Sequence, residues 1–168
     1  MLLKTNNHAE IIPDNCLGGI ELRVSIDDIE NDLRLMSVED YNSEKLNLSP
    51  PVINPNCTSD YFVEDLPIRI STDNRNKKIF RITAYKGYEG KLFGKIFVGM
   101  TVENAFSACP DLYYNEAEEV ILCKGVKGIS IALPIEDPLP NELPPLRIYA
   151  ISVFASETYS LKGIEGSW

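Results

Sequence analysis

The residues of this chain that are best suited to chemistry are acids placed close to one another or close to tyrosines. Asp28 and Asp32 stand four residues apart, so on a helix their two carboxylates would share one face. Two carboxylates on one face suit a divalent metal ion, acid–base catalysis or a basic protein partner. The simpler alternative is a solvated face whose charge favours the first turn of a helix.

A second group of candidates joins two tyrosines to three glutamates: Tyr113, Tyr114, Glu116, Glu118 and Glu119. Aromatic side chains anchor many protein interfaces, and acids beside them can steer and pair with lysine or arginine. The group therefore predicts a contact surface for a basic partner, with a plain surface loop as the alternative.

A third group lies in an exposed loop predicted over residues 134–145. The five prolines of this segment exclude a helix or a central strand. Glu136, Asp137 and Glu142 make the loop acidic. Because proline lowers the cost of ordering a loop on binding, these acids are further candidates for contact with a basic partner. A surface loop without a partner is again the alternative.

Residues for the common catalytic sites are missing from the sequence. His8 is the only histidine and lies in a polar lead-in, so it cannot build a Ser-His-Asp or Cys-His site on a rigid scaffold. The four cysteines form no C-x-x-C pair, which argues against structural zinc and favours small apolar core residues. No nucleophile elbow, Walker A or H-E-x-x-H motif is present. We therefore expect a protein that is not an enzyme and binds no cofactor or metal.

Charge and composition point in the same direction. The 168 residues carry a net charge of −9 and are 44% hydrophobic, which is typical of a globular protein with a sizeable core. The excess acid repels nucleic acid and anionic membranes and favours a basic partner, whose association would weaken as salt rises. Solubility alone is the alternative explanation of this charge. No signal sequence or membrane span is recognisable, so we expect a cytoplasmic protein with reduced cysteines.

The elements that would position these candidates follow from a repeat. Residues 18–26 return as 94–102, with glycine, isoleucine and a serine or threonine at matching places 76 residues apart. Residues 79–85 return in pattern as 148–154, 69 residues apart. Each copy of the first repeated segment ends near a serine or threonine that can cap a helix. Two repeated segments in the same order indicate two similar units in one chain.

We therefore predict an α+β fold of two repeated strand–helix–hairpin units, with an antiparallel sheet and the helices on one face. Residues 1–16 would form an N-terminal lead-in. Residues 17–90 would form the first unit, with a long insertion over 37–66. Residues 91–168 would form the second unit, which contains the proline-rich loop 134–145.

Apolar spacing and turn residues predict the individual elements. The predicted helices are 26–36 and 102–109. The predicted strands are 20–24, 61–63, 68–70, 79–85, 92–100, 120–123, 129–133 and 148–154. The last strand is apolar on both faces, which is typical of a buried central strand, although an edge offered to a partner would show the same pattern. Exposed strand edges would also permit a homodimer.

The Val-Gly-Met-Thr-Val-Glu-Asn-Ala-Phe sequence at 98–106 resembles the start of small α+β modules found in inhibitors and lipoproteins. The β-lactamase-inhibitor protein has two such units in tandem, and the related outer-membrane assembly lipoproteins have one. Residues 25–29 are a second copy of the motif, with Arg23 and Val24 where it prefers Gly-Met. The resemblance implies tandem α+β units. It leaves an outer-membrane assembly module as one alternative, against which the missing signal peptide and lipobox argue.

The chain more closely resembles immunity proteins of bacterial contact-dependent growth inhibition systems. The shared features are Gly-Gly-Ile-x-Leu at 18–22, Gly-Met-Thr-Val-Glu at 99–103 and the segment 125–131. This resemblance spans residues 17–155. It implies that the chain binds and neutralises one cognate toxin domain, often a nuclease acting on tRNA or DNA. No contact residue can be carried over from these proteins, so the candidates above rest on their chemistry. A carboxylate-dependent metal protein and an orphan without a toxin remain as alternatives.

Overall fold

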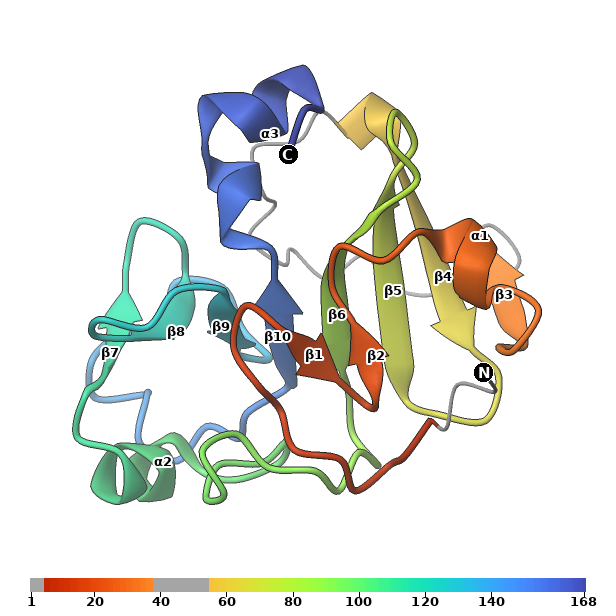
Figure 1. Ribbon diagram of the computed structural model, residues 1–168. Coiled ribbons are helices and arrows are strands. Elements are labelled where there is room, and N and C mark those ends of the chain that lie inside the picture. Colours follow the sequence, from red (N-terminus) through yellow and green to blue (C-terminus); the bar gives the residue numbers. More distant parts are fainter. Residues whose placement is uncertain (1–4, 38–54) are drawn as a thin grey trace.

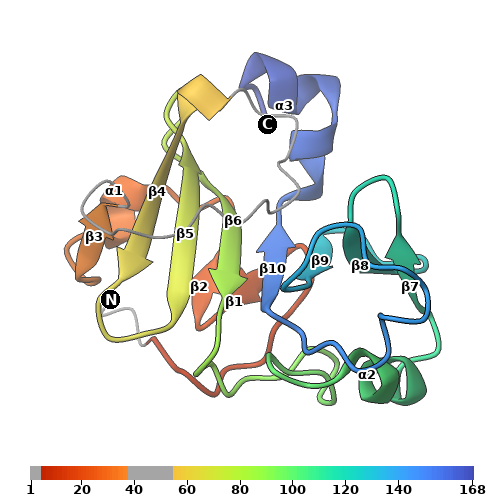
Figure 2. The same ribbon diagram turned by 180° about the vertical axis from the view of Figure 1, so that it is seen from behind.

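The computed structural model describes residues 5–37 and 55–168. It confirms the predicted α+β class, because eight antiparallel strands form a large sheet beside a few short helices. The strand order is β3-β4-β5-β6-β10-β9-β8-β7 (Figures 1 and 2). The strands are β3 (Leu35–Ser37), β4 (Thr58–Val63), β5 (Ile68–Asp73), β6 (Ile79–Ala84), β7 (Leu112–Asn115), β8 (Val120–Cys123), β9 (Ile129–Ala132) and β10 (Ala150–Phe154).

The remaining elements are short and lie around this sheet. A second, two-stranded sheet consists of β1 (Cys16–Leu17) and β2 (Ile20–Glu21). The helices are α1 (Ile26–Ile29), α2 (Val102–Ala108) and α3 (Leu161–Glu165), and the 3-10 turns are η2 (Pro55–Cys57) and η3 (Ser156–Tyr159). In the part of the chain that the structure describes, none of these helices is long and apolar enough to cross a bilayer.

The repeat in the sequence corresponds to a repeat in topology. The first unit consists of α1 followed by the four-stranded meander β3 to β6, and the second unit of α2 followed by β7 to β10. The last strands of the two meanders, β6 and β10, pair with each other in the middle of the sheet. The predicted two-stranded hairpin of each unit is therefore half of a larger meander.

The seam between the two units lies at matching residues of the repeat. Thr83 and Ser152 are 69 residues apart, which is also the spacing between the repeated segments 79–85 and 148–154. These two residues are direct partners across the β6–β10 ladder. Both residues are buried, and their hydroxyl oxygens are 2.8 Å apart in a hydrogen bond. An approximate two-fold axis between the units therefore passes close to this pair.

The residues before the two helices are also equivalent. Ser25 and Thr101 both have extended backbone, and each forms a β-bridge just before the final strand of its unit, to Lys78 and Arg147 respectively. Thr101 caps its helix, since its hydroxyl accepts a hydrogen bond from the Asn104 amide at 3.4 Å. Ser25 makes no such bond, and α1 is only four residues long.

The strands expected before the helices are wrong in extent. The first is a hairpin of β1 and β2 around Gly18 and Gly19, whose φ angles of 68° and 81° suit a tight turn. The predicted strand 92–100 does not form. Leu92 and Ile96 make a single bridge around a turn, because the chain reverses at the left-handed Gly94.

The predicted helix 26–36 is also too long. It ends at Ile29, and the chain pairs as β3 with β4 from Leu35 onward. Strand β4 contains the predicted 61–63 and extends it, so this part of the predicted insertion 37–66 belongs to the sheet. Residues 38–54 of that insertion lie outside the described residues. The hairpin of β5 and β6 and the buried central strand β10 are confirmed.

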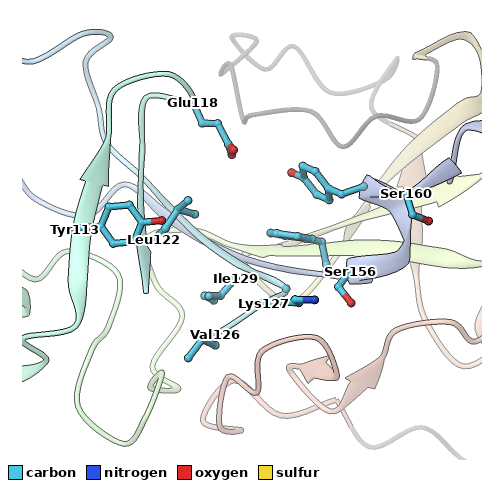
Figure 3. A pocket seen from close by; sticks show the side chains of 11 residues that line it. Tyr113, Glu118, Leu122, Val126, Lys127, Ile129, Ser156 and Ser160 are labelled. Carbon is cyan, nitrogen blue, oxygen red and sulfur yellow. The ribbon is translucent and has the colours of Figure 1, made fainter. Parts of the chain in front are cut away.

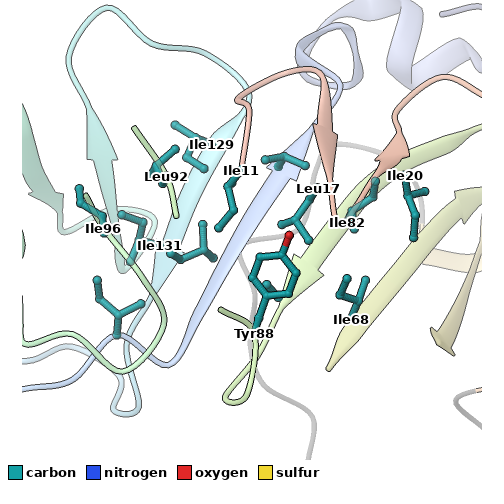
Figure 4. Packing of buried hydrophobic residues seen from close by; sticks show 14 of the residues in the cluster. Ile11, Leu17, Ile20, Ile68, Ile82, Tyr88, Leu92, Ile96, Ile129 and Ile131 are labelled. Carbon is teal, nitrogen blue, oxygen red and sulfur yellow. The ribbon is translucent and has the colours of Figure 1, made fainter. Parts of the chain in front are cut away.

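One face of the sheet, called here the first face, carries the main core. Ile68, Ile82 and Ile131 point from it toward the segments that precede the two helices (Figure 4). Those segments contribute Ile11, Leu17, Ile20, Tyr88, Leu92 and Ile96, all at most 3% exposed. Each fully buried isoleucine or leucine stabilises the fold by roughly 1.5–3 kcal/mol relative to exposure.

The predicted helices α1 and α2 bury Ile26, Ile29, Val102 and Ala105 in this same core. The third helix, α3, was not predicted and lies at one end of the sheet near the β5–β6 turn, where Arg75 donates to the Gly163 carbonyl at 2.8 Å. The opposite face of the sheet, called here the second face, is therefore free of α1 and α2.

Candidate functional site

The hairpin of β7 and β8 carries most of the predicted contact residues at one edge of the sheet. Tyr113 pairs with Leu122, and Tyr114 pairs with Ile121. Because side chains alternate along a strand, the two tyrosines point to opposite faces. Tyr114 packs against the core of the first face, whereas Tyr113 is 38% exposed on the second face.

The turn between these strands is held by its own side chains. The Asn115 side-chain oxygen accepts hydrogen bonds from the amides of Ala117 at 3.0 Å and Glu118 at 3.3 Å. Glu119 closes the turn with a φ of 54°. Glu116, Glu118 and Glu119 are consequently exposed together at the tip of the hairpin. We call the hairpin with these three glutamates the acidic hairpin.

A cavity of about 400 Å³ lies on the second face between the acidic hairpin and the C-terminal segment (Figure 3). We call it the hollow. Six apolar or aromatic side chains line it: Tyr113, Leu122, Val126, Ile129, Phe154 and Tyr159. Its polar lining consists of Glu118, Lys127, Ser156 and Ser160, and Gly128 completes the lining. The hollow thus combines an apolar interior with charged groups at its margin.

The aromatic rings on the C-terminal side of the hollow are in contact with one another. The ring centroids of Phe154 and Tyr159 are 4.9 Å apart, and Tyr159 remains 38% exposed. The Arg81 guanidinium lies 5.6 Å from the Phe154 ring centroid, which links the hollow to the central strands. Burial lowers the pKa of Arg81, and its interaction with Tyr159 opposes this change.

An ion-pair network fixes the segment η3 that forms one wall. Arg23 donates to both carboxylate oxygens of Glu157 and also to Asp14. Asp14 in turn accepts from the amide and hydroxyl of Ser156, at 2.8 and 3.1 Å. The hydrogen bonds from Arg23 lower the pKa of Glu157 despite its partial burial. The wall of the hollow is therefore tied to the N-terminal segment.

The predicted acids of the proline-rich loop approach the same end of the molecule. Burial raises the pKa of Tyr114, and the carboxylates of Glu119, Asp137 and Glu116 raise it further. These three acids therefore lie near enough to influence one tyrosine, although they come from the acidic hairpin and from loop 134–145. Glu136 is exposed in that loop, and the Glu142 carboxylate accepts from the Leu139 amide at 2.8 Å.

The structure does not bring Asp28 and Asp32 to this surface. Asp28 lies in α1 of the first unit, at the opposite end of the sheet from β7 (Figure 1). Asp32 lies beyond the end of α1, so the helical face that the two carboxylates were predicted to share does not form. The predicted pairing of these two acids is therefore wrong, because the helix is shorter than its apolar spacing indicated.

Sequence reasoning missed the C-terminal half of the hollow. Phe154 was recognised only as part of a buried strand, and Tyr159 follows that strand in a segment without clear periodicity. Alternation along 148–154 separates Phe154 from the core side chains Ile151 and Val153, and this signal could have placed it on the second face.

Within residues 5–37 and 55–168, no three histidine, cysteine, aspartate or glutamate side chains gather as a metal site would require. Set beside descriptions of protein families, curated proteins and solved structures, the chain matches none of them.

Proposed function

We propose that this protein is an immunity protein that binds a basic toxin domain and occludes its active site. The observation that carries the proposal is the hollow, whose lining joins Tyr113 and Tyr159 to Glu118 of the exposed acidic hairpin. Tyrosine combined with acid is a composition that suits tight contact with a basic surface. The net charge of −9 and the resemblance to immunity proteins of contact-dependent growth inhibition systems support the same function.

In this proposal the two parts of the surface have different tasks. Glu116 and Glu119 occupy positions that phosphates of a tRNA or DNA substrate would take in the toxin, and their charge speeds encounter. Tyr113 and Tyr159 stand on either side of the hollow and receive an apolar side chain of the toxin, which excludes water around the ion pairs. The protein performs no chemistry of its own and acts in the cytoplasm.

The proposal is tested by co-expressing the chain with the protein encoded immediately upstream. We expect a stable complex with a basic C-terminal domain, whose association rate falls as salt increases, because exposed charges are screened. Cells that produce the upstream domain should survive only when the chain is present. Failure of the pair to associate in low salt, or turnover of a substrate by the purified chain alone, would contradict the proposal.

A matched pair of variants locates the surface. Tyr113→Ala enlarges the hollow and removes a half-exposed ring, so we expect faster dissociation of the complex with little change in fold stability. Phe97→Ala removes a ring of similar exposure, 40%, that lies outside the hollow. An equal effect of both substitutions would place the interface elsewhere.

A further inference from the structure

Two of the four cysteines meet at the base of the acidic hairpin. Cys109 is the C-cap residue of α2, and Cys123 is the last residue of β8. The Cys109 carbonyl accepts a hydrogen bond from the Leu112 amide at 3.1 Å, and Leu112 is the cross-strand partner of Cys123. The backbone therefore brings the two cysteines to the same end of the hairpin.

The side chains of this pair also share one environment. Cys123 belongs to the core of the first face, Cys109 packs against that core, and the Cys109 thiol is close enough to influence the ionisation of Cys123. Cys123 is 7% exposed, whereas Cys109 is half-buried. Burial, followed by the neighbouring Cys109, raises the pKa of Cys123 to about 11. An external reagent therefore reaches Cys109 first.

The other two cysteines lie in different surroundings. Cys16 belongs to β1, where its neighbours are the carboxylates of Glu21 and Glu10. Cys57 lies in η2 and packs against the separate cluster formed by Phe80, Ala155 and Trp168. They provide internal controls within the same chain.

We propose that Cys109 and Cys123 form a site of reversible oxidation, at which a small-molecule disulfide such as glutathione disulfide converts the two thiols into one intramolecular disulfide. The Cys109 thiolate attacks the reagent and releases one small thiolate, leaving a mixed disulfide on Cys109. The Cys123 thiolate then attacks the Cys109 sulfur and displaces the second small thiolate. The two protein thiols give up two protons and two electrons, and the reagent is reduced to two thiols.

The disulfide would form a covalent loop that contains the whole of strand β7 and the turn of the acidic hairpin. The Lys124 amide already donates to the Asp111 carbonyl at 3.0 Å, so a backbone hydrogen bond closes the base of the hairpin directly beside the cysteine pair. A covalent bond there would hold α2 against β8 and limit opening of the hairpin. The reaction needs only this chain and the small-molecule disulfide, and it stands apart from the proposed toxin partner.

The test uses the purified full chain under native conditions. It is incubated with excess glutathione disulfide, the remaining thiols are alkylated, and the peptides are identified by mass spectrometry. We expect a peptide in which Cys109 is linked to Cys123, with Cys16 and Cys57 alkylated, and full reversal by dithiothreitol. The double variant Cys16→Ser and Cys57→Ser, which keeps the pair intact, should form the same disulfide at the same rate.

Single variants separate the two steps. Cys123→Ala should stop at the mixed disulfide on Cys109, and Cys109→Ala should leave the buried Cys123 unmodified for longer, with circular dichroism confirming each fold. Three results would overturn the proposal: a wild-type chain whose cysteines all remain alkylatable after prolonged oxidation, a persistent mixed disulfide on wild-type Cys109, or a disulfide that includes Cys16 or Cys57.

Discussion

The second face of the sheet differs between the two units although their backbones follow one plan. Ile70 pairs with Ile82 in the first unit, and Ile131 pairs with Ile151 in the second. These four isoleucines are equivalent, and all of them face the common core. Their neighbours in the sequence point the other way and are not alike.

At matching positions of the second face, the first unit has charged residues where the second has small ones. Arg69 corresponds to Ser130, and Arg81 corresponds to Ala150. Arg69 lies 3.4 Å from the carboxylate of Asp60, which occupies the position of Val120 in the second unit.

The aromatic residues of this face follow the same division. In the first unit, Phe62 and Tyr85 pack with ring centroids 6.2 Å apart. The corresponding residues of the second unit, Leu122 and Phe154, line the hollow instead. The isoleucines of the first face therefore maintain the repeated frame, while the second face is free to become charged in one unit and hollowed in the other.

The turn between β8 and β9, which fixes the hollow in the second unit, should be the most sensitive to substitution. Gly125 and Gly128 flank the β8–β9 turn with the same φ of 72°, but a Cβ on Gly128 would lie 2.5 Å from the Asp14 side chain, while Gly125 faces open space. We expect Gly128→Ala to destabilise by about 3 kcal/mol and Gly125→Ala by about 1 kcal/mol, measured by urea unfolding. Equal losses would mean that backbone strain alone matters and that Asp14 does not anchor this turn.

The next largest effect concerns the first unit, where the β5–β6 turn holds the last residue, Trp168. Burial alone would raise the pKa of Asp73, but hydrogen bonds from Arg75 at 2.7 Å and from the Trp168 indole at 3.0 Å hold it below its ordinary value of 3.8. The charged carboxylate therefore stabilises the fold above that pH, and its contribution is lost as pH falls through and below 3.8. Asp73→Asn should cost about 2 kcal/mol at pH 7.

This loss should shrink as the pH is lowered below 3.8, because the unfolded wild-type chain then takes up a proton that the folded carboxylate resists, which offsets the stabilisation. The free energy of unfolding of both proteins, measured by urea titration from pH 7 to 2, checks the prediction. Asp65→Asn is the matched control, since Asp65 is exposed. A loss for Asp73→Asn that stays constant over this range would show that the amide disrupts packing rather than charge.

The parts of the fold that the sequence predicts are those whose pattern is local. The hairpin of β5 and β6 could be predicted because β-branched residues alternate on both sides of a turn. The end of α1 could not, because Leu33 continues the apolar spacing of a helix while the chain already turns toward β3. Pairing of β3 with β4 across the long segment 38–54 overrides local preference there.

Only the half of the candidate site that lies on the acidic hairpin could be predicted, because its residues are neighbours in the sequence. Tyr113 and Glu118 are close in sequence, and their side-chain types indicate a contact surface. Adjacency could not show that Tyr113 and Tyr114 face opposite ways, because strand β7 is short and was not recognised. Tyr159 reaches the hollow through the tertiary arrangement of η3, which depends on Arg23 and is invisible to any local pattern.

Charge reversal in each unit separates the roles of the two ends of the sheet in binding. Glu116→Lys, Glu118→Lys and Glu119→Lys together should slow association with the proposed toxin about tenfold at low salt, because steering depends on charge near the contact. The matched control reverses the exposed Asp27, Asp28 and Glu30 of the first unit. Stopped-flow association at two salt concentrations measures both. An equal slowing would indicate that only net charge acts and that the acidic hairpin has no special position.

The smallest expected effect tests the seam where the two units meet. Thr83 and Ser152 are buried at 0% and 1% exposure, and each hydroxyl is the other's partner. Thr83→Val and Ser152→Ala should each leave one buried hydroxyl without that partner, whereas the double variant removes both. We expect the double variant to lose about 1 kcal/mol less free energy of unfolding than the two single losses added together, measured by urea unfolding as a double-mutant cycle.

The corresponding cycle with Thr72→Val in place of Thr83→Val should show no coupling, since Thr72 donates to the Ser59 carbonyl instead. Additive losses at Thr83 and Ser152 would mean that the backbone ladder between β6 and β10, and not this pair of hydroxyls, joins the two units.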